Sequence, residues 1–87
     1  MGFFSGVFST LNAIGKYSMA QDEAKRLVGL SEIVACRQLK VASTKADADE
    51  WKYLISALDQ LSTSESGQTA NFAALLAQYA ENLRDPN

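Results

Sequence analysis

One stretch, residues 18–42 (SMAQDEAKRLVGLSEIVACRQLKVA), constrains the fold more than any other part of the chain. Wound at about 3.6 residues per turn, it divides into an apolar half and a polar half, the pattern of a helix that lies against a core with its back in water. The apolar half holds Ala20, Ala24, Leu27, Val28, Leu30, Val34, Ala35, Leu39, Val41 and Ala42, and the polar half holds Lys25, Arg26, Glu32, Arg37 and Lys40. We therefore expect a helix over residues 19–42, about 36 Å long.

Gly29 is the one position at which this predicted helix could stop. Gly29, Leu30 and Ser31 could equally form a helix end, a hydrophobic contact and a new N-cap. The apolar side keeps its phase across Gly29, so we predict a continuous helix. A rod of this length extends past what a lone bundle of shorter helices can cover, which predicts a second subunit and hence a homodimer.

Three further amphipathic segments predict helices over residues 3–16, 45–61 and 69–84, while the polar stretch at 62–68 predicts a surface loop. Strands are not expected, because no alternating β-branched run bounded by turns occurs. At 87 residues, with 47% hydrophobic and 21% charged residues, the chain fits one all-α domain over residues 1–87. We expect a small four-helix bundle or a dimer of helical hairpins.

The sequence contains no histidine and a single cysteine, Cys36, which limits the chemistry it can perform. A Ser-His or Cys-His nucleophile pair cannot be built, and neither can a zinc site of histidines and cysteines. The acidic pairs Asp22-Glu23 and Asp49-Glu50 are explained by the favourable charge of helix starts. No glycine-rich phosphate loop occurs. We therefore expect a protein that is not an enzyme and that has no cofactor or metal.

Residues 21–40 resemble a helix-turn-helix, in which a turn similar to Gly-Leu-Ser at 29–31 joins a support helix to a recognition helix. The side chains that the resemblance would place in a DNA major groove are Arg37, Gln38 and Lys40. The chain departs from the motif at Lys25, where the motif has a small residue, and at Gln38, where it has a buried apolar one. A net charge of −2 and a pI near 4.9 also lack the basic field of DNA-binding proteins. DNA binding is therefore an alternative function, and we do not expect nucleic acid as the partner.

The segment 3–16 supports a second alternative, a peripheral membrane protein anchored by an amphipathic N-terminal helix. Interfacial helices usually carry more Lys and Arg on their polar side, so we expect this helix to pack on the core or on a second copy. The candidate residues for self-association are Phe3, Phe4 and Phe8. No Lys or Arg precedes the apolar run as in a signal peptide, and the single cysteine fits a reducing compartment, so we expect a cytoplasmic protein.

The remaining functional signal comes from apolar side chains that one small core does not need. Ile33 and Cys36 fall on the polar side of the predicted helix, among basic residues, and Tyr53 falls off the apolar side of the 45–61 helix. An aliphatic residue ringed by arginines is a common composition for a protein contact. We expect a non-enzymatic protein-binding module that acts as a regulator, inhibitor or scaffold. The candidate partner-binding residues are Arg26, Ile33, Cys36, Arg37, Lys40 and Tyr53.

Overall fold

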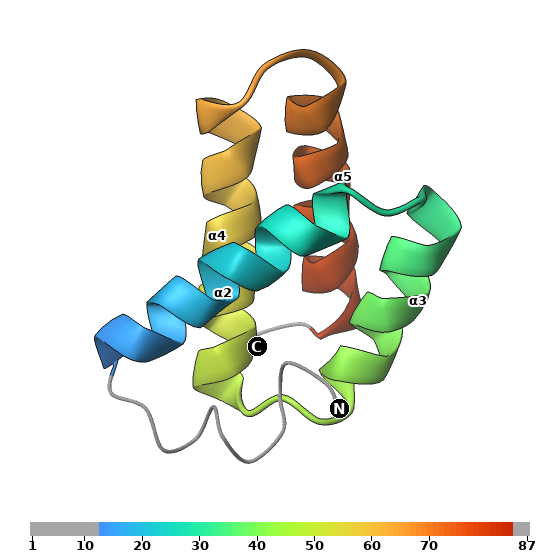
Figure 1. The fold of residues 1–87 in the computed structure, drawn as a ribbon. Helices are drawn as coiled ribbons and strands as arrows, with labels where there is room; N and C mark the ends of the chain where they lie inside the picture. Colours follow the sequence, from blue (N-terminus) through green and yellow to red (C-terminus); the bar gives the residue numbers. More distant parts are fainter. Residues whose placement is uncertain (1–12, 85–87) are drawn as a thin grey trace.

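The computed structural model describes residues 13–84, in which there are four helices and no strand (Figure 1). The helices are α2 (Ala13–Val28), α3 (Glu32–Ser43), α4 (Ala48–Ser64) and α5 (Gly67–Leu83). The all-α prediction is therefore confirmed. The predicted helix over residues 3–16 lies outside the described residues except for its last four, which belong to α2. The self-association candidates Phe3, Phe4 and Phe8 lie outside them too.

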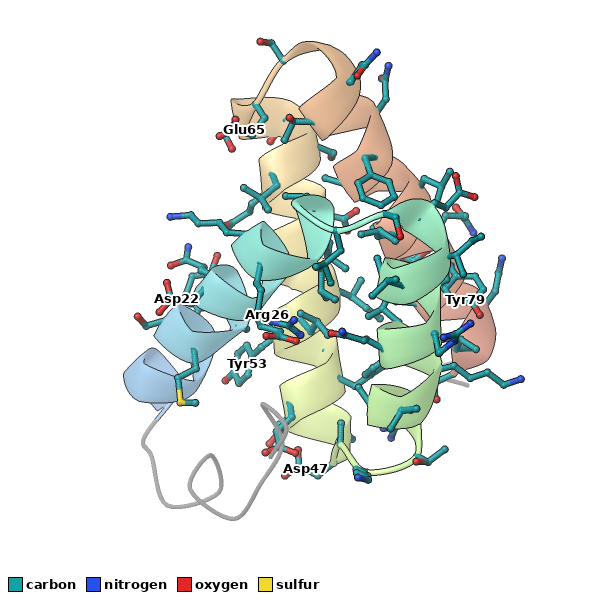
Figure 2. All side chains as sticks on the ribbon, turned by 45° about the vertical axis from the view of Figure 1, so that its right-hand side comes forward. Asp22, Arg26, Asp47, Tyr53, Glu65 and Tyr79 are labelled. Atoms are coloured by element: carbon teal, nitrogen blue, oxygen red, sulfur yellow. The ribbon has the colours of Figure 1, made fainter. Side chains whose placement is uncertain are left out.

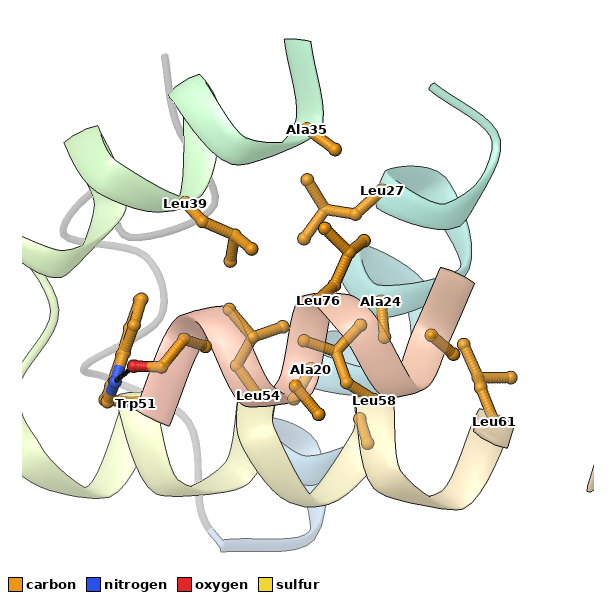
Figure 3. Close-up of a cluster of buried hydrophobic side chains, with 14 of the residues drawn as sticks. Ala20, Ala24, Leu27, Ala35, Leu39, Trp51, Leu54, Leu58, Leu61 and Leu76 are labelled. Carbon is orange, nitrogen blue, oxygen red and sulfur yellow. Dashed lines mark hydrogen bonds between the residues drawn. The ribbon is translucent and has the colours of Figure 1, made fainter. Parts of the chain in front are cut away.

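The helices α4 and α5 form an antiparallel hairpin, and α2 and α3 pack on it. Figure 1 shows α2 crossing α4 at a slant, while α3 lies beside α5. All four helices contribute to one cluster of buried side chains. The largest fully buried ones are the leucines Leu27, Leu39, Leu54, Leu58 and Leu76, most of which converge in Figure 3.

Alanine makes up more than half of the buried apolar residues of the described chain, which lets the helix backbones approach closely. On α5 the buried side is made of Ala73, Leu76, Ala77 and Ala80. The larger Leu75 is 42% exposed instead. The core therefore depends on small side chains at the helix crossings as much as on large ones between them.

The prediction of one continuous helix over residues 19–42 is wrong, because α2 ends at Val28 and α3 begins at Glu32. The N–H groups of Gly29 and Leu30 donate to carbonyl oxygens three residues back, which tightens the last turn of α2. Leu30 packs against the core, and the hydroxyl of Ser31 caps α3 by accepting from the N–H of Val34 at 3.3 Å. Glycine disfavours a helix interior by about 1 kcal/mol, so the Leu30 contact and the Ser31 cap prevail over the continuous pattern.

This break changes which side chains α3 buries. Ala35 and Leu39 face the core, but Val34 and Val41, which we expected in the apolar half, are 38% and 51% exposed. Because α2 and α3 each pack on the same hairpin, no overhanging rod is left for a second subunit to cover. The homodimer stays a prediction, without that reason for it.

The helix α4 begins at Ala48, three residues after the predicted start at position 45, and Asp47 caps it. Asp47 Oδ1 accepts from the N–H of Glu50 at 2.8 Å, and Glu50 Oε1 accepts from the N–H of Asp47 at 2.9 Å. This reciprocal capping box satisfies two amide groups that the helix itself cannot pair. Thr44 instead ends α3, where its hydroxyl donates to the carbonyl oxygen of Val41 at 2.7 Å.

The predicted loop over residues 62–68 is much shorter in the structure, because α4 continues to Ser64 and only residues 65–66 separate it from α5. The hydroxyls of Ser62 and Thr63 donate to the carbonyl oxygens of Asp59 and Gln60, at 2.5 and 2.9 Å. Such bonds let polar residues extend a helix. Gly67 then reverses the chain with a φ of +64°, a conformation that other L-residues rarely adopt.

Arg84, which directly follows α5, closes one end of the core against Trp51. Its Nη1 donates to the carbonyl oxygens of Ala46 and Ser43, at 2.6 and 3.5 Å, and its guanidinium carbon lies 5.7 Å from the centroid of the Trp51 ring. The Trp51 Nε1 donates to the carbonyl oxygen of Ala80 at 3.3 Å, drawn as a dashed line in Figure 3. These contacts, the Trp51–Arg84 latch, join the end of α5 to the end of α3 and the start of α4.

The capping box generates a prediction with a built-in control. Asp47→Ala is expected to lower the free energy of unfolding by about 1 kcal/mol, because the Glu50 amide loses its side-chain acceptor. Ser66 holds the equivalent position before α5, but its side chain makes no capping hydrogen bond, so Ser66→Ala should cost clearly less. Urea unfolding followed by circular dichroism measures both; equal losses would contradict this assignment.

Candidate protein-binding surface on α3

The helix α3 buries one side and leaves the opposite side uncovered. Its buried residues are Ala35 and Leu39, so the residues about half a turn away point outward. We name this outward set the α3 outer face; it consists of Ile33, Val34, Arg37, Lys40 and Val41, all of which are exposed. In Figure 2 the helix α3 lies toward the viewer, in front of α5. The candidate residues Ile33, Arg37 and Lys40 are thus brought together on one face.

The α3 outer face is unusually apolar for a surface. Ile33 is 71% exposed, and Val41 and Val34 add two more aliphatic side chains. Among the side chains that the structure describes, these are three of the four large apolar ones that are exposed; the fourth, Leu75, lies on α5. Single exposed apolar residues are common on any protein, but their concentration on one short helix indicates a contact surface.

The basic side chains of this face are unpaired within the described residues. Arg37 and Lys40 are exposed, and neither forms an ion pair with any residue between positions 13 and 84. With Glu32 they give α3 a net charge of +1 (two basic residues and one acidic), whereas the whole chain carries −2. The α3 outer face is therefore locally basic on an acidic protein.

Arg26, another candidate, lies on α2, where it is exposed but forms hydrogen bonds to other residues of the chain. Its Nε and Nη2 donate to the two carboxylate oxygens of Glu23 at 2.8 and 2.6 Å, and Nη2 also donates to Gln38 Oε1 at 2.5 Å. The bond to Glu23 raises the pKa of Arg26 above its ordinary value, although burial opposes the shift. Arg26 thus links α2 to α3, as Figure 2 shows, and Gln38 is half-buried in this link. Neither side chain belongs to the α3 outer face.

Tyr53 also lies apart from the α3 outer face. It is half-buried on α4 and makes an edge-to-face contact with Tyr17 of α2, with the ring centroids 6.1 Å apart and the planes at 71°. This pair strengthens the crossing of α2 over α4. Packing within the chain accounts for the position of Tyr53.

Cys36 sits at the margin of the α3 outer face, half-buried and packed against the core. Burial raises the pKa of its thiol, and the nearby carboxylate of Glu32 raises it further. The reactive thiolate is therefore scarce near neutral pH. Cys36 can contribute apolar contact area to a partner, but it is poorly suited to act as a nucleophile.

Two residues of this surface, Val34 and Val41, were assigned to the core by the sequence pattern. The signal that places them outside is the Gly-Leu-Ser turn at 29–31, which shifts the helical phase between α2 and α3. The break lets α3 pack in an orientation independent of α2, and in the structure Ala35 and Leu39 face inward while the two valines face outward. The packing of α3 on α5, and not the periodicity of α3 alone, therefore decides which residues form the outer face.

The other described parts of the chain show weaker evidence of a binding site than the α3 outer face. A shallow cleft of about 480 Å³ lies between α2 and the end of α4, where Gln21 Nε2 donates to Gln60 Oε1 at 3.3 Å across it. Within residues 13–84, no three potential ligands among His, Cys, Asp and Glu lie close enough together to hold a metal ion. None of the four helices described has the length and apolar composition of a membrane span.

Comparison with known proteins found no matching family model, no matching curated protein and no matching solved structure.

The environment of Cys36 predicts its reactivity. As the pH is raised, the alkylation rate of the folded chain should reach its plateau at a higher pH than that of the chain unfolded in urea. The reason is that the Cys36 thiol has a higher pKa in the folded chain. The pH at which the alkylation rate is half-maximal reports the pKa of the thiol. Glu32→Gln should lower this pH midpoint for the folded chain toward its ordinary value, because a neighbouring negative charge is removed. Iodoacetamide labelling across a pH series, read by mass spectrometry, measures both. A folded midpoint at or below the unfolded one would contradict the environment described.

Proposed function

We propose that the protein is a non-enzymatic module that binds another protein through the α3 outer face and thereby acts as a regulator, inhibitor or scaffold. The observation that supports this most is Ile33, which is 71% exposed in the first turn of α3. Val34, Val41 and two basic side chains without an ion-pair partner in residues 13–84 lie on the same face. Burying an aliphatic side chain of this size contributes about 1.5 to 3 kcal/mol. A partner that covers the face gains this free energy, whereas the isolated chain does not.

The proposal places the protein in the cytoplasm, and the free thiol of Cys36 supports a reducing compartment. Self-association through Phe3, Phe4 and Phe8 remains a separate proposal, in which the chain folds as a four-helix bundle or as a dimer of hairpins. So does a membrane anchor formed by the same segment. Phe3, Phe4 and Phe8 lie outside the described residues, so these proposals are tested separately from the α3 outer face.

DNA binding is the second candidate, and one observation favours it. A three-residue turn at 29–31 separates α2 from an α3 that starts at a serine N-cap, as in a helix-turn-helix. However, Gln38 is held by Arg26, and the aliphatic residues of the outer face offer no hydrogen bonds to base edges. The net charge of −2 also opposes approach to phosphates. We therefore rank protein binding first.

Crosslinking from the outer face tests the primary proposal. A photo-crosslinking amino acid in place of Ile33 should give discrete adducts with one or a few proteins in cells, identified by mass spectrometry. The same residue in place of Thr63, which is exposed on α4, should not give them. Ile33→Asp should abolish recovery of the same proteins with the helical circular dichroism retained, because Ile33 contributes little to the core. Identical adducts from both positions, or full recovery by Ile33→Asp, would contradict the proposal.

The DNA alternative makes an ionic prediction. If α3 enters a major groove, affinity for duplex DNA should fall steeply with salt concentration and fall further on Arg37→Ala. We expect no binding at physiological salt in a fluorescence-anisotropy titration. Preferential binding of one sequence under those conditions would rank DNA above protein.

A further inference from the structure

We infer that the partner presents an acidic amphipathic helix, which packs its apolar side on Ile33 and Val41 and pairs its carboxylates with Arg37 and Lys40. This inference rests on the protein-binding function proposed above and adds the chemistry of the partner. It follows from the way apolar and basic side chains alternate along the α3 outer face.

The apolar contacts define an elongated surface. Ile33, Arg37 and Val41 recur every four residues, so they form a ridge along α3 that spans about 12 Å between its ends. Val34 widens the ridge at its beginning. Ridges of this spacing fit between the side chains of a second helix, which offers apolar residues at intervals of three and four. A partner helix of a few turns therefore covers the face.

The two cations of the α3 outer face determine the charge that the partner must present. Arg37 lies between the two ends of the aliphatic ridge, and Lys40 precedes Val41, so any covering surface brings its own side chains against both cations. Neither cation has an ion-pair partner in residues 13–84. Covering an unpaired cation costs free energy unless an acceptor comes with the partner. Carboxylates that flank the apolar side of the partner supply that acceptor, and Arg37 can bind one through two parallel hydrogen bonds.

The same charges argue against other occupants. A two-fold pairing of this face with a second copy sets the Arg37 and Lys40 of one copy near those of the other, and like charges at a contact are unfavourable. DNA supplies the negative charge but leaves the aliphatic ridge without an apolar surface to bury it. Anionic lipid would usually meet aromatic side chains and more basic ones than the two of this face.

A display library of helical peptides tests directly whether the α3 outer face prefers an acidic partner helix. The peptides have about 18 residues, with leucines fixed at helical spacing and Glu, Lys or Gln at random elsewhere. Selection on the full chain should enrich sequences with an excess of Glu over Lys. Selection on the double variant Arg37→Glu, Lys40→Glu should reverse the excess to Lys. Lys25→Glu, Lys52→Glu changes the net charge equally at exposed positions on α2 and α4, so it should leave the excess of Glu unchanged. An individual acidic peptide should bind the first double variant at least about tenfold more weakly than the unmodified chain.

The outcomes separate this inference from the function on which it rests. No enrichment, an excess of Glu that survives the reversal at positions 37 and 40, or binding of peptides by Ile33→Asp would overturn the acidic-helix inference. So would binding of mixed-sequence duplex DNA or phosphatidylserine vesicles at physiological salt in place of peptides. Specific crosslinks from position 33 would then still support protein binding, with a partner of different chemistry. Circular dichroism of each variant verifies that the helices are retained.

Discussion

The reversal of the chain at residues 29–31 is the constraint on which the rest of the structure depends. It lets α2 cross α4 while α3 lies beside α5, so that leucines from all four helices meet in one cluster. Three local interactions hold it: the tightened last turn of α2, the burial of Leu30 and the cap that Ser31 provides for α3. Arg26, held in place by Glu23 on the same helix, adds a link across the turn through its hydrogen bond to Gln38, which joins α2 to α3.

Much of this structure could be predicted from sequence, and the errors share one cause. Apolar periodicity predicted the helices that correspond to α4 and α5 and placed Leu27 and Leu39 in the core, because burial of large side chains sets the pattern. The helix ends were predicted less well: the predicted helix began at 45, whereas the local capping box of Asp47 and Glu50 starts α4 at Ala48. The candidate surface was found in part, through Ile33, Arg37 and Lys40. Val34 and Val41 were missed because a continuous helix was assumed across Gly29.

The α3 outer face combines two properties, exposed aliphatic side chains and cations without an ion-pair partner in residues 13–84. Its aliphatic side chains lie outside the core, and within residues 13–84 its cations form no ion pair with a carboxylate. Arg26 differs from Arg37 in this respect, because its guanidinium donates hydrogen bonds to Glu23 and Gln38 of the same chain. What makes α3 a candidate surface is thus the absence of internal partners within the described chain, and the partner-binding role is the interpretation that uses both properties.

The Trp51–Arg84 latch has a consequence for the order in which the molecule assembles. Arg84 bonds to carbonyl oxygens 41 and 38 residues earlier, at the end of α3 and just before α4. During synthesis, α3 is therefore complete long before the residue that anchors its end has left the ribosome. Contacts of such sequence separation form late, because the intervening chain must first be ordered. The end of α3 consequently gains its Arg84 contacts only in a chain that includes Arg84, so a chain that stops before this residue would hold the outer face less firmly for a partner.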